Sequence, residues 1–165
     1  MKTHTVIGGL VAVMAFATAH QVYANNYGII LAGCVPTDAT VVADRYRTGG
    51  HGVFIKGSGT ARFTCAVPIT GATWHSVDIY YKDPDGIGSN YEVKAFLKGA
   101  NLGSTVGTAV CGVSSNAKST SAYTAMRCEF SDFSPSSSKW YWVDVQIFRR
   151  TGFTEEIEVL GLNIN

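Results

Sequence analysis

The sequence lacks the local motifs that mark most zinc proteins, thiol redox proteins and serine hydrolases. It contains no CxxC pair and no GxSxG motif, and the only histidines beyond residue 24 are His51 and His75. A structural zinc site needs four cysteine or histidine ligands, and a serine hydrolase of the α/β type needs its nucleophile motif. The sequence therefore predicts no metal, no cofactor and no catalytic residue, and it favours a protein that is not an enzyme.

Charge is also scarce, and neither sign is clustered. Thirteen Lys and Arg residues, Lys2 among them, stand against twelve Asp and Glu residues. A nucleic-acid-binding surface needs a basic patch, and binding to anionic lipid needs a polybasic segment. Nucleic acid and membrane surfaces are therefore not expected as partners.

Long apolar runs are absent except at the start of the chain. Met1 to His4 has one fixed positive charge, Val6 to Ala19 is uncharged and apolar, and Val22-Tyr23-Ala24 ends on a small residue. This order is typical of a secretory signal peptide, and the run is short for a transmembrane helix. We expect residues 1–24 to be cleaved after Ala24 and residues 25–165 to form one secreted domain without stable membrane insertion.

A second interpretation of the leader is a lipoprotein signal. Leu31-Ala32-Gly33-Cys34 matches a lipobox, which would place a lipid anchor on Cys34. However, polar residues separate this motif from the apolar run, and lipidation would leave an odd number of cysteines. Simple secretion, to the periplasm or the extracellular space, is therefore favoured over anchoring.

Four cysteines occur, and export makes disulfides their expected state. Pairing of neighbours along the chain joins Cys34 to Cys65 and Cys111 to Cys128. The second bond is expected to tie two adjacent strands across a polar loop. Closing a loop of that size stabilises a fold by about 3 kcal/mol in the chain-entropy model.

The strongest strand pattern covers residues 139–150. Tyr141, Val143, Val145 and Ile147 fall on one side of an extended backbone and predict a buried face. The opposite side is aromatic and polar. Arg149 and Arg150 at its end are expected to face solvent, where Arg149 could pair with a glutamate of the last strand.

Other short alternating segments follow one another with turn signals between them. Residues 73–82 and 90–98 are expected to form a long hairpin through the turn Asp83-Pro84-Asp85-Gly86, and residues 106–113 are expected to pair with 122–130. No segment beyond residue 24 has helical periodicity. The pattern predicts an all-β domain of about 8–10 strands, an antiparallel sandwich or jelly-roll-like fold.

An aromatic strand face is the main candidate binding site. If the strands that contain Trp74 and Trp140 share a sheet, aromatic rings would lie beside carboxylate and amide groups. Rings stack on the apolar faces of sugars, and the polar groups bind hydroxyls. The alternative is that the tryptophans are covered or fill the edge of a sandwich. The predicted ligand-binding residues are Trp74, Asp78, Tyr80, Trp140, Trp142, Asp144 and Gln146.

Three other groups of residues have ordinary structural explanations. Asp83, Asp85 and Asn90 could ligate calcium, but the proline and glycine between them already explain a turn. His75 is expected on the face of Val77 and Ile79. Glu156 and Glu158 are expected on one solvated strand face, without the opposed carboxylates that glycoside hydrolysis needs.

Three functions remain open at this stage. The first is a non-enzymatic structural or surface-assembly protein, in which Tyr27 to Leu31 or Leu160 to Ile164 adds a strand to a neighbouring copy. The second is a carbohydrate-binding module that uses the aromatic face. The third and weakest is a secreted hydrolase.

Overall fold

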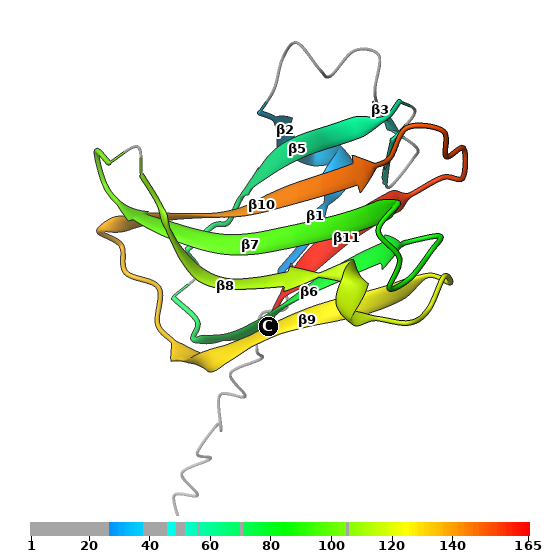
Figure 1. The fold of residues 1–165 in the computed structure, drawn as a ribbon. Coiled ribbons are helices and arrows are strands. Elements are labelled where there is room, and N and C mark those ends of the chain that lie inside the picture. The colour runs from blue at the N-terminus through cyan, green and yellow to red at the C-terminus, as the bar shows by residue number, and fades with distance from the viewer. Residues whose placement is uncertain (1–26, 38–45, 49–51, 56, 70, 105) are drawn as a thin grey trace, which may run out of the picture.

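The structure is a computed structural model, and it describes residues 27–37, 46–48, 52–55, 57–69, 71–104 and 106–165. The predicted signal peptide at residues 1–24 and His51 lie outside these residues. Two antiparallel sheets pack face to face into a sandwich, which confirms the predicted fold class (Figure 1). Among the described residues, no helix is long and apolar enough to cross a membrane.

Sheet A contains six strands: five lie in the order β3-β4-β11-β6-β9, and β1 pairs with β11 on the same edge as β4, further along the strand. Sheet B contains five strands in the order β2-β5-β10-β7-β8. The strands of sheet A are β1 (Tyr27–Ile30), β3 (Tyr46–Thr48), β4 (Val53–Ile55), β6 (Trp74–Lys82), β9 (Thr124–Phe133) and β11 (Glu158–Ile164). Those of sheet B are β2 (Val35–Pro36), β5 (Gly59–Ala66), β7 (Tyr91–Asn101), β8 (Thr108–Ser114) and β10 (Lys139–Arg149). Two short 3-10 turns, η1 (Leu31–Gly33) and η2 (Ser115–Ala117), complete the described elements.

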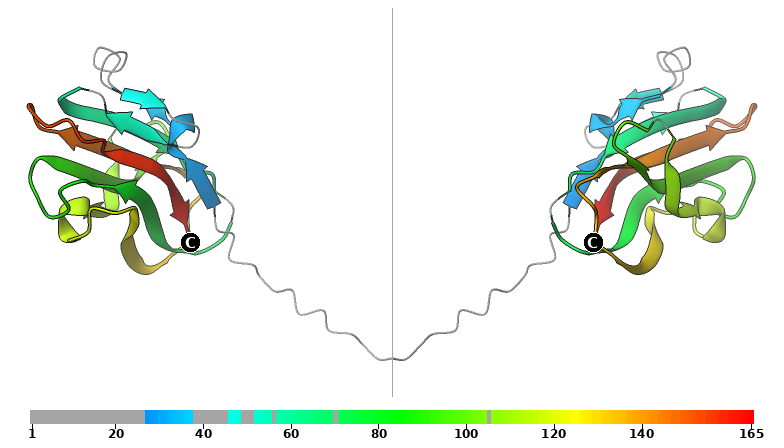
Figure 2. Two further views of the ribbon diagram at one scale, coloured as in Figure 1. Left: turned by 90° about the vertical axis from the view of Figure 1, so that its right-hand side faces the viewer. Right: turned by 90° about the vertical axis from the view of Figure 1, so that its left-hand side faces the viewer.

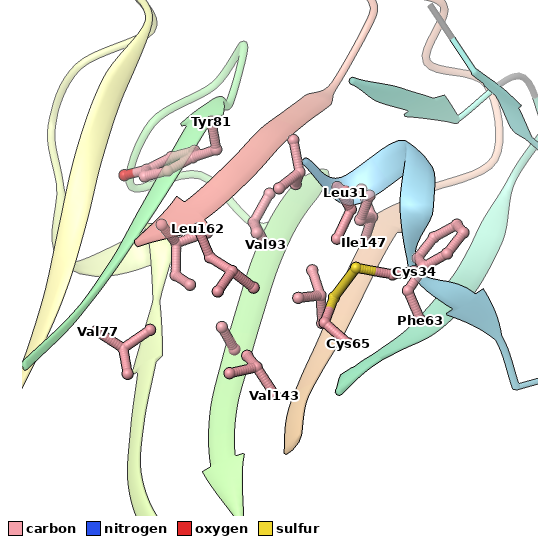
Figure 3. Packing of buried hydrophobic residues seen from close by; sticks show 14 of the residues in the cluster. Leu31, Cys34, Phe63, Cys65, Val77, Tyr81, Val93, Val143, Ile147 and Leu162 are labelled. Carbon is pink, nitrogen blue, oxygen red and sulfur yellow. A yellow bond between two sulfur atoms is a disulfide. The ribbon is translucent and has the colours of Figure 1, made fainter. Parts of the chain in front are cut away.

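The core lies between the two sheets and is built from alternate residues of each strand. Tyr141, Val143, Val145 and Ile147 of β10 are all buried, as the alternation predicts. Side chains from the inner face of sheet A, such as Tyr81 and Leu162, pack toward them (Figure 3). The opposite side of β10 is therefore free to carry polar and aromatic residues.

The predicted strand pairs are wrong, because the connections between them cross from one sheet to the other. β6 pairs with β11 and β9 in sheet A, whereas β7 pairs with β10 and β8 in sheet B. The turn at residues 83–86 forms as expected, with Gly86 at φ 60°, but it leads to the other layer instead of closing a hairpin. Likewise β8 and β9 belong to different sheets.

Both predicted disulfides are confirmed. The Cys34–Cys65 bond joins the end of η1 to β5, and Cys111–Cys128 joins β8 to β9. The second bond was expected to tie two adjacent strands. Because β8 and β9 are edge strands of different sheets, it ties the two layers together instead. The Sγ atom of Cys34 is bonded to that of Cys65, so this structure has no thiol at the lipobox position.

The two terminal apolar segments pair with each other. β1 runs antiparallel to the last residues of β11, from Tyr27 opposite Ile164 to Ile30 opposite Gly161, and Figure 2 shows the two strands side by side. β11 also pairs with β6 on its other edge. Strand addition to another copy therefore stays a prediction, and its use of Leu160 to Ile164 would require β1 to leave β11.

Arg149 does not face solvent, so that prediction is wrong. It follows Ile147 by two residues on the inward side of β10 and is buried at the end of the sandwich. Its Nε donates a hydrogen bond of 3.1 Å to the carbonyl oxygen of Gly57. Arg150, one residue later, is exposed as predicted.

Candidate functional site

The seven predicted site residues are divided between the two sheets. Trp140, Trp142, Asp144 and Gln146 lie on β10 in sheet B, whereas Trp74, Asp78 and Tyr80 lie on β6 in sheet A. The expectation that the two strands share a sheet is therefore wrong. The outward faces of the two sheets look in opposite directions, so the seven side chains do not form one surface.

Trp74 belongs to the core. It is 4% exposed, and its ring centroid lies 5.2 Å from that of Tyr141 and 5.8 Å from that of Phe133. The pairing of β6 with β9 shifts register between Trp74 and Ser76. Such an irregularity breaks strict alternation, so Trp74 turns inward and His75 turns outward. His75, predicted to share a face with Val77 and Ile79, instead lies exposed with its Nδ1 2.8 Å from Oδ1 of Asp132.

Asp78 is a buried structural carboxylate. Arg127 donates to both of its oxygens, from Nε at 2.6 Å and from Nη2 at 2.8 Å, and Asn165 Nδ2 donates at 2.9 Å. The hydrogen bonds from Arg127 lower the pKa of Asp78 despite its burial. Its oxygens are therefore occupied by the protein itself. Tyr80, two residues later, is 44% exposed on the outer face of sheet A.

The four β10 residues lie on an open face of sheet B, which we call the β10 face. The cross-strand register places Trp142 between Ala66 and Lys98, Asp144 between Thr64 and Phe96, and Gln146 between Arg62 and Lys94. Figure 1 shows β5, β10, β7 and β8 side by side. The outward residues of β5, β7 and β10 that define this face are Thr60, Arg62, Thr64, Ala66, Glu92, Lys94, Phe96, Lys98, Trp140, Trp142, Asp144, Gln146 and Phe148.

Four aromatic side chains lie on the β10 face. Trp140 is 63% exposed, and Trp142, Phe96 and Phe148 are half-buried. None belongs to the core, so this face is not covered by the described residues. Phe96 was missed by the sequence analysis, although alternation places it between the outward residues Lys94 and Lys98.

Glycines allow two of these rings to lie close to the sheet. A Cβ atom at Gly107, just before β8, would overlap the indole ring of Trp142. A Cβ atom at Gly112 would lie 2.6 Å from Cδ1 of Phe96, which pairs with it across the strands. The absence of these side chains lets β8 and its leading loop support the edges of the two rings.

The charged groups of the β10 face are mostly paired. Asp144 accepts a hydrogen bond of 3.0 Å from Thr64 Oγ1, and its other oxygen lies 2.5 Å from Lys98 Nζ. Lys94 Nζ lies 2.9 Å from Glu92 Oε2. Among the described residues, neither the Gln146 amide nor the Arg62 guanidinium has a recorded side-chain partner. These two groups are therefore available to a ligand.

Two hollows flank Gln146. One of about 210 Å³ is lined by residues that include Arg62, Lys98, Asp144 and Gln146. The other, of about 250 Å³, is lined by Thr60, Glu92, Lys94, Gln146 and Phe148. Flat rings beside hydrogen-bonding groups suit a ligand with alternating apolar faces and hydroxyl edges.

The glutamates weighed for hydrolysis do not share a strand face. Glu155 and Glu156 are exposed and precede β11, whereas Glu158 is buried and accepts a hydrogen bond from the Tyr123 hydroxyl. The prediction of one solvated face for Glu156 and Glu158 is therefore wrong, because the strand begins only at Glu158. This arrangement does not place two carboxylates on opposite walls of a cleft.

The aspartates of the turn after β6 bind protein groups. Asp83 is buried and accepts a hydrogen bond of 2.5 Å from Ser115 Oγ, and Asp85 Oδ2 accepts one of 2.9 Å from the backbone N–H of Asn90. In the part of the chain that the structure describes, no three His, Cys, Asp or Glu residues are grouped so that they could hold a metal ion. Burial is the main cause that raises the pKa of Asp83 to about 6.

Replacement of this buried carboxyl should make stability less dependent on pH. Because its folded-state pKa lies above the ordinary value, the contribution of Asp83 to stability is greatest in acid and falls as pH rises through about 4 to 6. The free energy of unfolding of Asp83→Asn minus that of the natural sequence should therefore be more positive at pH 7 than at pH 4, by about 2 kcal/mol. Urea unfolding of both proteins at several pH values measures this difference. A difference that stays constant across this range would contradict it.

No protein-family model matches the sequence, and no curated protein matches it. Several solved structures resemble it at low sequence identity. One is a chain from work on the promiscuous specificity of carbohydrate-binding modules of the β-sandwich superfamily, with 10% identity and a TM-score of 0.48 over 69% of this chain and 45% of that one. This chain thus spans less than half of that protein.

Two further structures match over most of both chains. The xylan-binding module CBM15 has 15% identity and a TM-score of 0.46, covering 84% of this chain and 94% of the module. The low-affinity xylan-binding module CBM86 from Roseburia intestinalis has 12% identity and a TM-score of 0.46, covering 85% and 94%. Identities and TM-scores this low assign no ligand to this chain, so its function has to be argued from its own side chains.

Proposed function

We propose that this chain is a secreted, non-catalytic domain that binds polysaccharide through the β10 face. The observation that supports this proposal is the open outer face of sheet B, where Trp140, Trp142, Phe96 and Phe148 lie among polar side chains. A group of aromatic side chains on one open face is typical of a binding site, whereas single exposed apolar residues are ordinary. The two disulfides are consistent with an oxidising, extracellular location.

The geometry of the face suits an extended chain of sugars better than a single small molecule. Its two hollows lie side by side, with Gln146 lining both of them. Neighbouring strands are about 4.8 Å apart, so a side-chain row across β5, β10 and β7 extends about 10 Å. A chain of sugar rings lying on the face could use the indole of Trp142 for stacking and the amide of Gln146 for hydroxyls. Trp74, Asp78 and Tyr80 have no place in this site.

A panel of insoluble and soluble polysaccharides tests the proposal. We expect the natural sequence to bind at least one glycan, with a change in tryptophan fluorescence, because two of its three tryptophans lie on the face. Tyr80→Ala is the matched control, since it removes an exposed aromatic ring from the opposite sheet and should bind unchanged. Binding to no polysaccharide in the panel would contradict the proposal. Light scattering on the same sample separates it from the assembly hypothesis, which requires large ordered particles.

A further inference from the structure

We propose that the β10 face selects polysaccharides that contain uronic acids, and that Arg62 binds their carboxylate groups. This inference rests on the proposed function and adds the class of glycan to it. It comes from the charge pairing on the face, where, among the residues that the structure describes, every charged side chain except Arg62 has a partner of opposite charge.

The other charges of the face neutralise one another. Lys98 is paired with Asp144, and Lys94 with Glu92, at the distances given above. The carboxylates of Asp144 and Glu92 are therefore occupied. In the structure as described, no carboxylate lies within ion-pair distance of Arg62, and its side chain is exposed. Within the described residues, the β10 face therefore has one positive charge without an opposite partner.

The position of Arg62 places this charge within reach of a bound glycan. Arg62 pairs with Gln146 across β5 and β10, and both line the same hollow beside Asp144 and Lys98. Trp142 lies on β10, four residues before Gln146, and the side chains of these two residues point to the same face of the sheet. A sugar chain stacked on Trp142 and bonded to Gln146 would therefore pass beside the guanidinium.

Guanidinium and carboxylate groups match in shape as well as charge. Arginine presents N–H donors in a planar fork that can bind both oxygens of a carboxylate. A hydroxyl of a neutral sugar offers only one atom to the same fork. An ion pair at an exposed site contributes up to about 1 kcal/mol, which corresponds to a factor of up to about five in affinity. The Arg62 guanidinium should therefore bind the carboxylate of a uronate residue more tightly than the hydroxyls of a neutral sugar.

The test compares acidic polysaccharides with their carboxyl-reduced forms, which keep the sugar rings and their linkages but lose the charge. The probes are polygalacturonate and glucuronoxylan, measured by affinity electrophoresis and calorimetry. We expect carboxyl reduction to weaken binding of the natural sequence about two- to fivefold. Arg62→Gln should bind the acidic form about as weakly as the natural protein binds the reduced form. Arg150→Gln is the control, because Arg150 is exposed and its replacement changes the net charge equally.

The outcomes separate this inference from the proposed function. Equal binding to the acidic and the carboxyl-reduced forms would overturn the inference but would leave the proposed binding of polysaccharide intact. Binding to neutral glycans alone would have the same two consequences. Equal losses in Arg62→Gln and Arg150→Gln would show a general effect of charge and would also overturn it. Failure to bind any polysaccharide would remove the proposed function itself. A selective loss in Arg62→Gln, confined to the acidic forms, supports the inference.

Discussion

Replacement of Trp142 by alanine should weaken polysaccharide binding by about 10- to 100-fold, the largest loss expected from any single substitution on the β10 face. Trp142 lies on the outward side of the middle strand of sheet B, with Lys98 on one side and Ala66 on the other. Its ring is half-buried, so it is held in place before a ligand arrives. A rigid aromatic ring loses little entropy on binding and offers a large apolar surface. Calorimetry against the best glycan of the panel measures the change.

A second substitution moves the ring without removing it. Gly107→Val would place side-chain atoms where the Trp142 indole now lies, so the ring has to shift. We expect this variant to lose affinity while it keeps all three tryptophans. Circular dichroism shows whether both variants keep the fold, which they should, because neither residue belongs to the core. Unchanged affinity in Trp142→Ala would show that the aromatic residues of this face do not bind the glycan.

The β10 strand shows what the sequence could predict. Its alternation identified both the buried set, from Tyr141 to Ile147, and the outward set that includes Trp140 and Trp142. The periodicity of a strand depends only on the backbone, so it can be followed along the sequence. The disulfides Cys34–Cys65 and Cys111–Cys128 were predictable for a different reason, because export and the even number of cysteines left few pairings and neighbours along the chain were favoured.

The partners of each strand could not be predicted in the same way. Nothing local in residues 83–90 distinguishes a hairpin from a connection to the other sheet, so β6 and β7 were paired wrongly. That error brought Trp74 and Asp78 into the predicted site. The irregularity at Trp74 depends on pairing with β9, some fifty residues away along the chain, and no pattern within β6 indicates it. Arg62, which we propose binds uronate, was missed because that proposal depends on the pairing of Asp144 with Lys98, which is visible only in the folded sheet.

Loss of the Cys34–Cys65 disulfide should lower the free energy of unfolding by about 3–4 kcal/mol. The two cysteines are separated by 31 residues, and the bond restricts the unfolded chain over that length. Cys34 follows η1, the turn through which the chain passes from β1 in sheet A to β2 in sheet B. Figure 3 shows the bond in the core, close to Leu31 and Phe63. Replacement of both cysteines by alanine removes the crosslink and also part of the contact that the two sulfur atoms make with the apolar core.

The second disulfide provides a matched comparison. Cys111–Cys128 encloses a separation of 17 residues, so the chain-entropy model assigns it about 3 kcal/mol, slightly less than the first. Urea unfolding of the two double-alanine variants measures both effects against the natural sequence. For a single domain with a total stability of about 5–15 kcal/mol, either loss is large. Equal unfolding midpoints for the Cys34→Ala/Cys65→Ala variant and the natural sequence would contradict the prediction. A loss well above 4 kcal/mol would instead show that the bond also holds η1 and β1 against the core, because their detachment would expose Leu31 and the edge of β11.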